Sequence, residues 1–137
     1  MRKNVLIVLE ARILAGYMKV ALEEEGIAAE VLSIGTFLER LKGDMRNVGV
    51  VILEMIIPHE DELLVEETDD GNETGSALYR KLQKKAPGMR TILLKNRDIP
   101  TGLKPAEHLL EVLKFDATPS FIVDCVQHTF TKQSSAP

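Results

Sequence analysis

The chain has 137 residues, of which 45% are apolar and 28% are charged, as is ordinary for one globular domain with an adequate core. The net charge is −4. Nucleic-acid binding is disfavoured because the sequence has no cluster of Lys and Arg with interleaved aromatics, no Trp and only six aromatic residues. One cysteine, Cys125, excludes an internal disulfide and indicates a reducing compartment, so we expect a cytoplasmic protein. The apolar run 5–9 is far too short to span a bilayer, which takes about 20 residues.

The first part of the chain alternates apolar strands with amphipathic helices. A stripe formed by Leu14, Met18 and Leu22, at spacings of four, predicts a helix. Thr36 with Glu39 three residues later is typical of a capping box, so Thr36 is expected to open the second helix. In order, we expect a strand at 4–9, a helix at 11–25, a strand at 28–34, a helix at 36–43 and a strand at 48–55.

The second part continues the alternation but allows two interpretations near its end. The expected elements are a helix from Thr74 to about 85, a strand at 90–94, a strand at 109–113 and a helix opened by Thr118 and Pro119. Pro100 and Pro105 leave little room for a full helix between the last two strands. The competing interpretation makes 106–115 a helix and 120–126 a strand; we favour the first. The inner face of the last helix is expected to carry Phe121, Ile122, Cys125, Val126 and Phe130.

This order of elements predicts an α/β fold. Alternating strands and helices imply right-handed crossovers and a doubly wound parallel sheet with helices on both faces. The strand at 48–55 has no polar alternation until Glu54, as suits a strand buried on both faces. In such sheets the chemistry lies at the carboxyl ends of the strands, which is where Glu54 falls. We expect one domain over 1–131 and a frayed tail at 132–137.

An acidic segment follows the central strand. Residues 59–74 contain eight acidic side chains and no Lys or Arg, and without them the chain has 13 acidic residues against 17 basic ones. Loops of this length are usually functional or disordered. The stretch 69–73 lacks the ligand spacing of a calcium loop, so we interpret 59–74 as an inserted solvated loop beside the basic outer face of the next helix. His59, His108 and His128 are too scattered to suggest a metal site.

Taken together, these pieces resemble the receiver domain of bacterial two-component response regulators over nearly the whole chain. Residues 51–58 (Val-Ile-Leu-Glu-Met-Ile-Ile-Pro) are similar to the family's pattern of hydrophobic residues, an Asp, two or three apolar residues and a Pro. Residues 74–79 (Thr-Gly-Ser-Ala-Leu-Tyr), followed by Leu82, are similar to the start of its third helix. The resemblance implies a five-stranded flavodoxin-like fold, here with a shortened or irregular fourth helix.

The sequence departs from the family pattern where the family is phosphorylated. The family has an acidic pair after the first strand, a phospho-accepting Asp ending the third, Ser or Thr ending the fourth and Lys ending the fifth. The matching positions here hold Leu9 with Glu10, Glu54, Lys95 and Lys114, the last followed by Phe115 in place of the usual Pro. The loop after Pro58 is also longer by more than about ten residues, so the resemblance is to a degenerate receiver.

These substitutions predict an internally paired site. Glu10 and Glu54 supply one carboxylate fewer than the family's three for Mg²⁺, which needs well-placed oxygen ligands. A Glu carboxyl lies about 1.5 Å further out than that of Asp, and a misplacement of about 1 Å can cost about 100-fold in rate. We predict that Lys114 and Lys95 hold Glu54, with Glu10 nearby, and expect no cofactor beyond weak Mg²⁺ binding. The opposing interpretation treats all four as ordinary charged residues at strand ends.

The resulting functional hypothesis is a stand-alone pseudo-receiver that signals through protein partners, without normal phosphorylation and without catalysis. No effector domain follows the receiver-like part of the sequence, so its output is expected to act in trans. One alternative is a Mg²⁺-dependent phosphorylatable receiver. The other is a small α/β ligand-binding domain or enzyme on the same fold, since a fold does not fix a function. Partner identity and oligomeric state stay open.

Overall fold

Five parallel strands form the centre of the structure, in the order β2-β1-β3-β4-β5. The computed structural model describes residues 3–55, 74–98 and 100–134. The elements are β1 (Asn4–Val8), α1 (Arg12–Glu24), β2 (Ala29–Val31), α2 (Ile34–Leu41), β3 (Val48–Glu54), α4 (Thr74–Lys85), β4 (Arg90–Lys95), β5 (Leu109–Leu113), the 3-10 helix η1 (Lys114–Asp116) and α5 (Pro119–Ser134). This strand order is that of the flavodoxin-like doubly wound sheet, as predicted.

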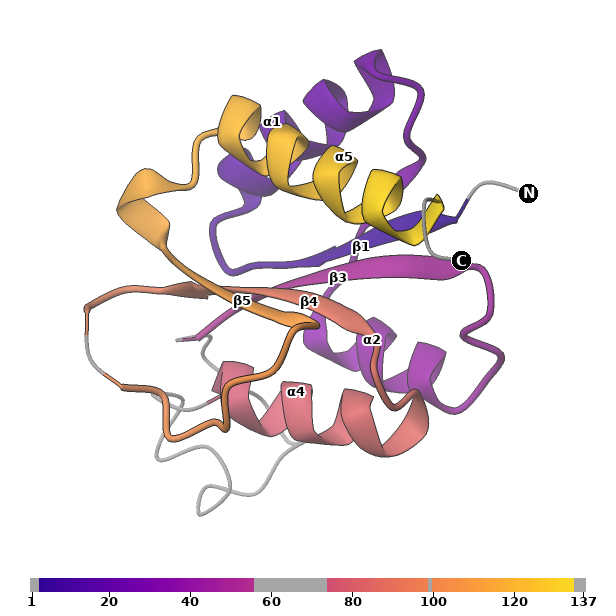
Figure 1. Cartoon of the computed structure of the whole chain (residues 1–137), viewed down its shortest axis with the longest axis vertical. Coiled ribbons are helices and arrows are strands. Elements are labelled where there is room, and N and C mark those ends of the chain that lie inside the picture. The colour runs from indigo at the N-terminus through magenta and orange to yellow at the C-terminus, as the bar shows by residue number, and fades with distance from the viewer. Residues whose placement is uncertain (1–2, 56–73, 99, 135–137) are drawn as a thin grey trace.

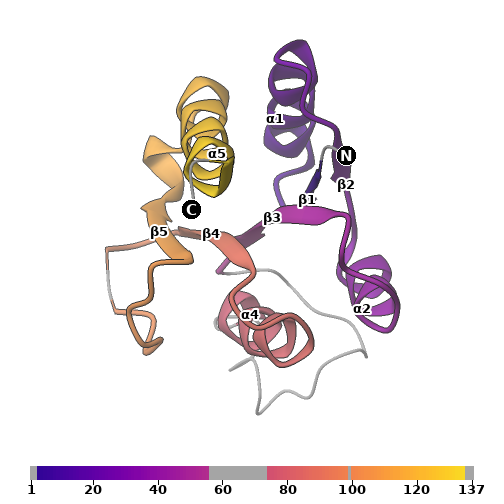
Figure 2. The ribbon, with the colours of Figure 1, turned by 45° about the vertical axis from the view of Figure 1, so that its right-hand side comes forward.

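The helices cover both faces of the sheet. Helices α1 and α5 lie on one face and α2 and α4 on the other (Figures 1 and 2). Each face has its own apolar core, because successive residues of a strand point to opposite faces. In β1, for example, Leu6 packs into the α2–α4 core, whereas Val5 and Ile7 pack into the α1–α5 core.

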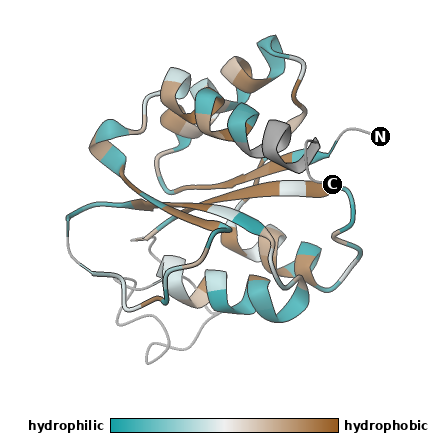
Figure 3. Ribbon diagram, viewed as in Figure 1, coloured by the Kyte–Doolittle hydropathy of each residue, from teal (hydrophilic) through white to brown (hydrophobic). Residues whose placement is uncertain are grey.

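The central strand β3 is buried along its whole length. All seven of its residues are buried, and Figure 3 shows the strands as the most hydrophobic part of the ribbon. Burial on both faces explains why this sequence lacks the polar alternation of a half-exposed strand. It also brings a charged residue, Glu54, into a fully buried position at the strand's carboxyl end.

The start of α2 differs from the prediction. Strand β2 ends at Val31, and Ser33 is the N-cap of α2, accepting a hydrogen bond from the backbone N–H of Thr36 at 3.2 Å. The predicted capping box of Thr36 and Glu39 is therefore wrong; Glu39 instead pairs with Lys42 at 3.0 Å. Ser and Thr are both good caps, and local sequence does not tell which of two such residues fills the position.

The connection between β4 and β5 contains no helix within its described residues, 96–98 and 100–108. The expected shortened helix is thus replaced by an irregular segment, in which Gly102 has a φ of 78°. Pro100 and Pro105 remove two backbone N–H donors from this segment, and Pro also restricts the residue before it. The favoured interpretation of 109–126 is confirmed: 109–113 is a strand, and the last helix begins at Pro119.

Helix α5 is longer than expected, and it faces the core with a slightly different set of residues. It extends to Ser134, three residues into the expected tail. Ile122, Val123 and Val126 are buried, whereas Phe121, expected inside, is 41% exposed. The side chain of Phe130 lies outside the described set. Within the described ranges, none of the helices combines the length and hydropathy that a bilayer crossing requires.

Candidate functional site

The carboxyl ends of the strands bring the predicted site residues to one edge of the sheet. Glu10 follows β1, Glu54 ends β3, Lys95 ends β4 and Lys114 directly follows β5. Because β1, β3, β4 and β5 are neighbours and parallel, residues that are remote in sequence meet at this edge. The edge therefore holds two glutamates and two lysines, but only Glu54 and Lys114 of these four side chains pair with each other among the described contacts.

Glu54 is the buried centre of this edge. Its side chain is 0% exposed, and each carboxylate oxygen accepts a hydrogen bond. Lys114 Nζ donates to Oε2 at 2.7 Å, and the backbone N–H of Glu10 donates to Oε1 at 3.0 Å. The predicted contact between Glu54 and Lys114 is present. Both interactions offset part of the desolvation cost of this buried carboxylate.

Glu10 serves the site through its main chain. Its backbone N–H binds Glu54, while its own side chain is exposed. Among the described side chains, no three His, Cys, Asp or Glu residues gather closely enough to hold a metal ion. A hard cation such as Mg²⁺ takes several oxygen ligands, and the Glu54 oxygens already have protein partners.

Lys95 belongs to a second pair, contrary to the prediction that it holds Glu54. Within the described part of the chain, its Nζ makes ion pairs with Glu111 at 3.3 Å and with Asp98 at 3.9 Å. Glu111 faces Leu93 in the β4–β5 register, so Lys95 lies two residues further along β4 on the same side. Sequence reasoning missed Glu111, although a lone acid within the apolar strand Leu109–Leu113 was a usable signal.

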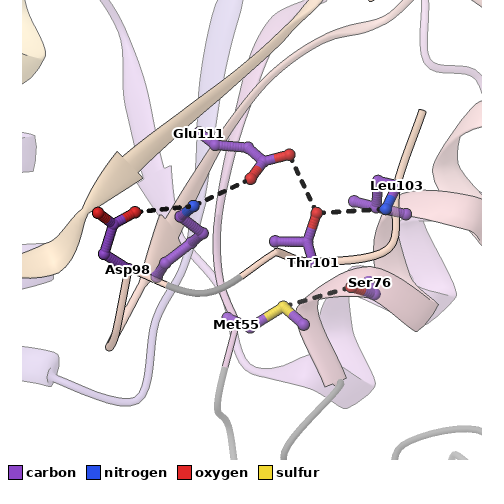
Figure 4. Close-up of polar contacts among 7 residues, drawn as sticks. Met55, Ser76, Asp98, Thr101, Leu103 and Glu111 are labelled. Carbon is purple, nitrogen blue, oxygen red and sulfur yellow. Dashed lines mark hydrogen bonds and ion pairs between the residues drawn. The ribbon is translucent and has the colours of Figure 1, made fainter. Parts of the chain in front are cut away.

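Glu111 also fixes the irregular connection before β5. Thr101 Oγ1 donates to Glu111 Oε2 at 3.0 Å, and the backbone N–H of Leu103 is 3.3 Å from the same hydroxyl oxygen. Figure 4 shows Thr101 on one side of Glu111 and Asp98 on the other. The ion pairs of Lys95 connect Glu111 with Asp98. Polar contacts thus hold a segment that carries no helical hydrogen bonds of its own among its described residues.

A glycine determines how closely α4 packs against the end of β3. A Cβ on Gly75 would lie 2.6 Å from the Glu54 carbonyl oxygen and 2.7 Å from Met55 Cα, so no other residue fits without a backbone shift. The Gly75 N–H donates to the Met55 carbonyl at 2.9 Å. Ser76 Oγ lies 3.3 Å from Met55 Sδ (Figure 4). The Thr-Gly-Ser start of the helix therefore holds the backbone next to Glu54.

Tyr79 and His108 form a further link between α4 and the connection before β5. Tyr79 Oη lies 2.7 Å from His108 Nε2, and the rings are stacked with centroids 6.1 Å apart and an interplanar angle of 20°. Burial raises the pKa of the Tyr79 hydroxyl, because the phenolate would lose its hydration. The neutral hydroxyl is thus the form that this contact uses.

The remaining chemically capable residues do not extend the site. Cys125 is half-buried on α5; burial, and to a smaller extent Asp124, raise the pKa of its thiol, which opposes thiolate formation. His128 is exposed on the same helix. His59, the 69–73 stretch considered for calcium and the rest of 59–73 lie outside the described residues.

The fold was compared with known proteins. No family model and no curated protein matches the sequence. Among solved structures, a receiver domain protein from Methanospirillum hungatei is 18% identical with a TM-score of 0.67 and covers 98% of each chain. A receiver protein from Sinorhizobium medicae is 14% identical with a TM-score of 0.71 and covers 95% of each chain. The receiver domain of the Francisella response regulator 1452 is 18% identical with a TM-score of 0.68, covering 96% of this chain and 99% of that one. At these identities the likeness concerns the fold, and it confirms the resemblance at that level: the chain has the fold of response regulator receiver domains.

Proposed function

We propose that this chain is a pseudo-receiver, a signalling module that acts by protein–protein contact and does not use the normal phosphorylation chemistry of its fold. The observation that carries the proposal is the closed state of Glu54. Its carboxylate is 0% exposed, and Lys114 and the Glu10 N–H engage its two oxygens. A carboxylate must approach a phosphorus atom to accept a phosphoryl group, and this one is already occupied.

The electrostatics of the site support the same proposal. A phosphorylatable carboxylate works with a divalent cation that neutralises the phosphoryl oxygens, and Mg²⁺ needs several oxygen ligands at well-defined positions. Here Lys114 supplies the positive charge directly to Glu54, and the Glu10 carboxylate is exposed. We therefore propose that the site needs no Mg²⁺ and that the Glu54–Lys114 pair holds one conformation of the strand ends.

The surface near this edge suits contact with proteins. Helices of a parallel α/β fold begin at the carboxyl edge of the sheet, so Ile13, Phe115 and Phe121 lie around that edge. Ile13 is 77% exposed and Phe115 is 94% exposed. Tyr17 and Val20 continue the exposed apolar stripe of Ile13 along α1 at spacings of four and three. Contiguous apolar surface of this kind is typical of interaction sites.

The proposal is tested by amide NMR on the wild type and on Glu54→Gln, each with Mg²⁺ alone and with Mg²⁺ and beryllofluoride. Glu30→Gln serves as the control, because Glu30 lies on the edge strand β2, in register with Val51 and not with Glu54, and forms an ion pair with Arg40. We expect no response to either addition from the wild type. Glu54→Gln alone is expected to shift amides around 9–11, 54–55 and 113–116, whereas the control shifts only its own neighbourhood.

Two outcomes would decide against the proposal. Saturable Mg²⁺ binding with beryllofluoride-dependent shifts at the strand ends of the wild type would make the chain a phosphorylatable switch. If Glu54→Gln changed no amide beyond its own neighbours, the pair would hold no conformation, and the charged residues would be ordinary strand-end side chains.

A further inference from the structure

A concave surface lies on the α2–α4 side of the sheet, apart from the site at Glu54. It is a groove of about 820 Å³ between α2 and α4, the two helices that share one face of the sheet (Figure 2). Most of its lining comes from the C-terminal halves of both helices, while Gly35 lies near the start of α2 and Lys42 directly follows it. Because these helices run against the strands, their C-terminal ends lie at the amino edge of the sheet, away from the site described above.

The groove combines an apolar floor with a basic rim. Leu38 and Leu41 of α2 line it, and Gly35, which has no side chain, lies one turn before them. The remaining lining residues are charged: Glu39, Lys42, Lys81, Lys84 and Lys85. We refer to this surface as the basic groove. Leu38 is only partly buried against the core of this face, so some of its apolar surface stays available.

Among the described lining residues of the basic groove, four lysines face one acidic residue. Glu39, the acid among these described residues, is 3.0 Å from Lys42, so its charge is already matched within the rim. Lys84 and Lys85 are exposed. Lysines in the last turn of a helix also stabilise the helix dipole. That role explains the lysines of α4, but it does not explain the apolar residues that line the groove beside them. The surface therefore offers hydrophobic contact and positive charge together.

We propose that the basic groove docks an acidic amphipathic segment of a partner protein. Apolar side chains one turn apart would rest on Leu38 and Leu41, and flanking Asp or Glu side chains would meet the exposed Lys84 and Lys85. Helix-in-groove recognition uses anchors at this spacing, and charge complementarity fixes their register. Nucleic acid is a poorer match, because no aromatic residue is among the described lining residues to stack on bases. This inference concerns a different surface and does not rest on the Glu54 proposal.

The test uses a fluorescein-labelled Glu-rich helical peptide with two leucines four positions apart, and a companion in which both leucines are serine. Binding is measured by fluorescence anisotropy at low salt, and the site is located by amide NMR. The test variant is Lys84→Glu with Lys85→Glu. The control variant, Arg80→Glu with Lys104→Glu, has the same net charge and changes exposed residues outside the groove lining.

We expect the leucine peptide to shift amides of 35–42 and 81–85 in the wild type. Its affinity should fall on the order of tenfold in the test variant, as expected for the replacement of two exposed ion pairs by like charges. The control variant should lose less than about threefold. Leu38→Ala should weaken the leucine peptide and leave the serine peptide unchanged, because only the former uses the floor. Circular dichroism of each variant checks that α4 remains folded.

Three results would overturn the proposal. The absence of groove shifts at about 1 mM leucine peptide would show no docking site for this chemistry. Equal affinity for both peptides would make the groove a simple anion patch. Tighter binding of a DNA duplex of equal charge, with the same groove shifts, would assign it to nucleic acid.

Discussion

The two lysine–glutamate pairs at the carboxyl edge of the sheet look alike in sequence but differ in what depends on them. In the first, Glu54 of the central strand β3 is fully buried, and Lys114 is its charged partner. In the second, Glu111 of the edge strand β5 is 27% exposed and shares Lys95 with Asp98. The first acid has lost its hydration and relies on Lys114, whereas the second is still partly hydrated.

The position of each strand in the sheet explains this difference. β3 lies between β1 and β4 and is covered on both faces, so a charge at its end has little access to water. β5 is an edge strand, and the connection that precedes it carries no helix among its described residues. The Lys95–Glu111 pair and the Thr101 contact therefore anchor a connection, while the Glu54–Lys114 pair neutralises a buried charge.

The largest expected effect comes from breaking the buried pair. Lys114→Met should reduce the free energy of unfolding by about 3 kcal/mol, because it leaves the buried Glu54 carboxylate without a cation. Urea denaturation measures the loss. The double variant Lys114→Met with Glu54→Gln should recover most of it, since no buried charge remains and the Gln oxygen still accepts from the Glu10 N–H. A loss below about 1 kcal/mol in the single variant would mean that Glu54 is hydrated after all.

A smaller effect is expected from the link between α4 and the connection before β5. Tyr79→Phe should cost about 1 kcal/mol, because it removes the hydroxyl that bonds His108 Nε2. The wild type should also lose stability as pH rises above about 10, where an unfolded Tyr ionises, because the folded pKa of Tyr79 is raised and the native state keeps its proton.

The control for this prediction is the pH dependence of the stability difference between the wild type and Tyr79→Phe. The difference in unfolding free energy between wild type and Tyr79→Phe should be constant between about pH 8 and 9 and shrink between about pH 10 and 11. Subtracting the variant removes the contributions of other groups that titrate in this range, Cys125 among them. A difference that stays constant up to pH 11 would show that Tyr79 keeps an ordinary pKa in the folded protein.

Much of the fold could be predicted from the sequence, because the apolar runs of the sequence coincide with the strands that are buried in the structure. The apolar runs at 4–9, 48–55 and 90–94 lie in the three central strands, and burial on both faces removes any polar alternation. The Thr-Gly start of α4 could be recognised as a motif, although the reason for its glycine, the close approach to Glu54 and Met55, appears only in three dimensions. The contact of Glu54 with Lys114 followed from parallel strands ending together.

Two of the misses share one physical cause: a choice among equivalent neighbours. Ser33 rather than Thr36 caps α2, because either hydroxyl could fill the position and the path of the chain decides. The sequence predicts that Lys95 pairs with Glu54, but Lys95 pairs with Glu111 of the neighbouring strand β5. The register between two strands cannot be deduced from the sequence of either strand alone. The third miss has another cause: the described residues of the connection, 96–98 and 100–108, form no helix, whereas Pro100 and Pro105 had predicted only a shortened one.

The smallest expected effect tests the partly exposed pair. Lys95→Met should cost only about 0.5–1 kcal/mol, because Glu111 keeps water and the Thr101 hydroxyl as partners. This loss should shrink further in 1 M NaCl, where the Debye length is about 3 Å, whereas the loss in Lys114→Met should change little because buried pairs are poorly screened. Lys104→Met, at an exposed site outside both pairs, provides the baseline. If Lys95→Met and Lys114→Met lost equal amounts and responded equally to salt, the two pairs would be equivalent, and burial of Glu54 would no longer distinguish the central site from the edge.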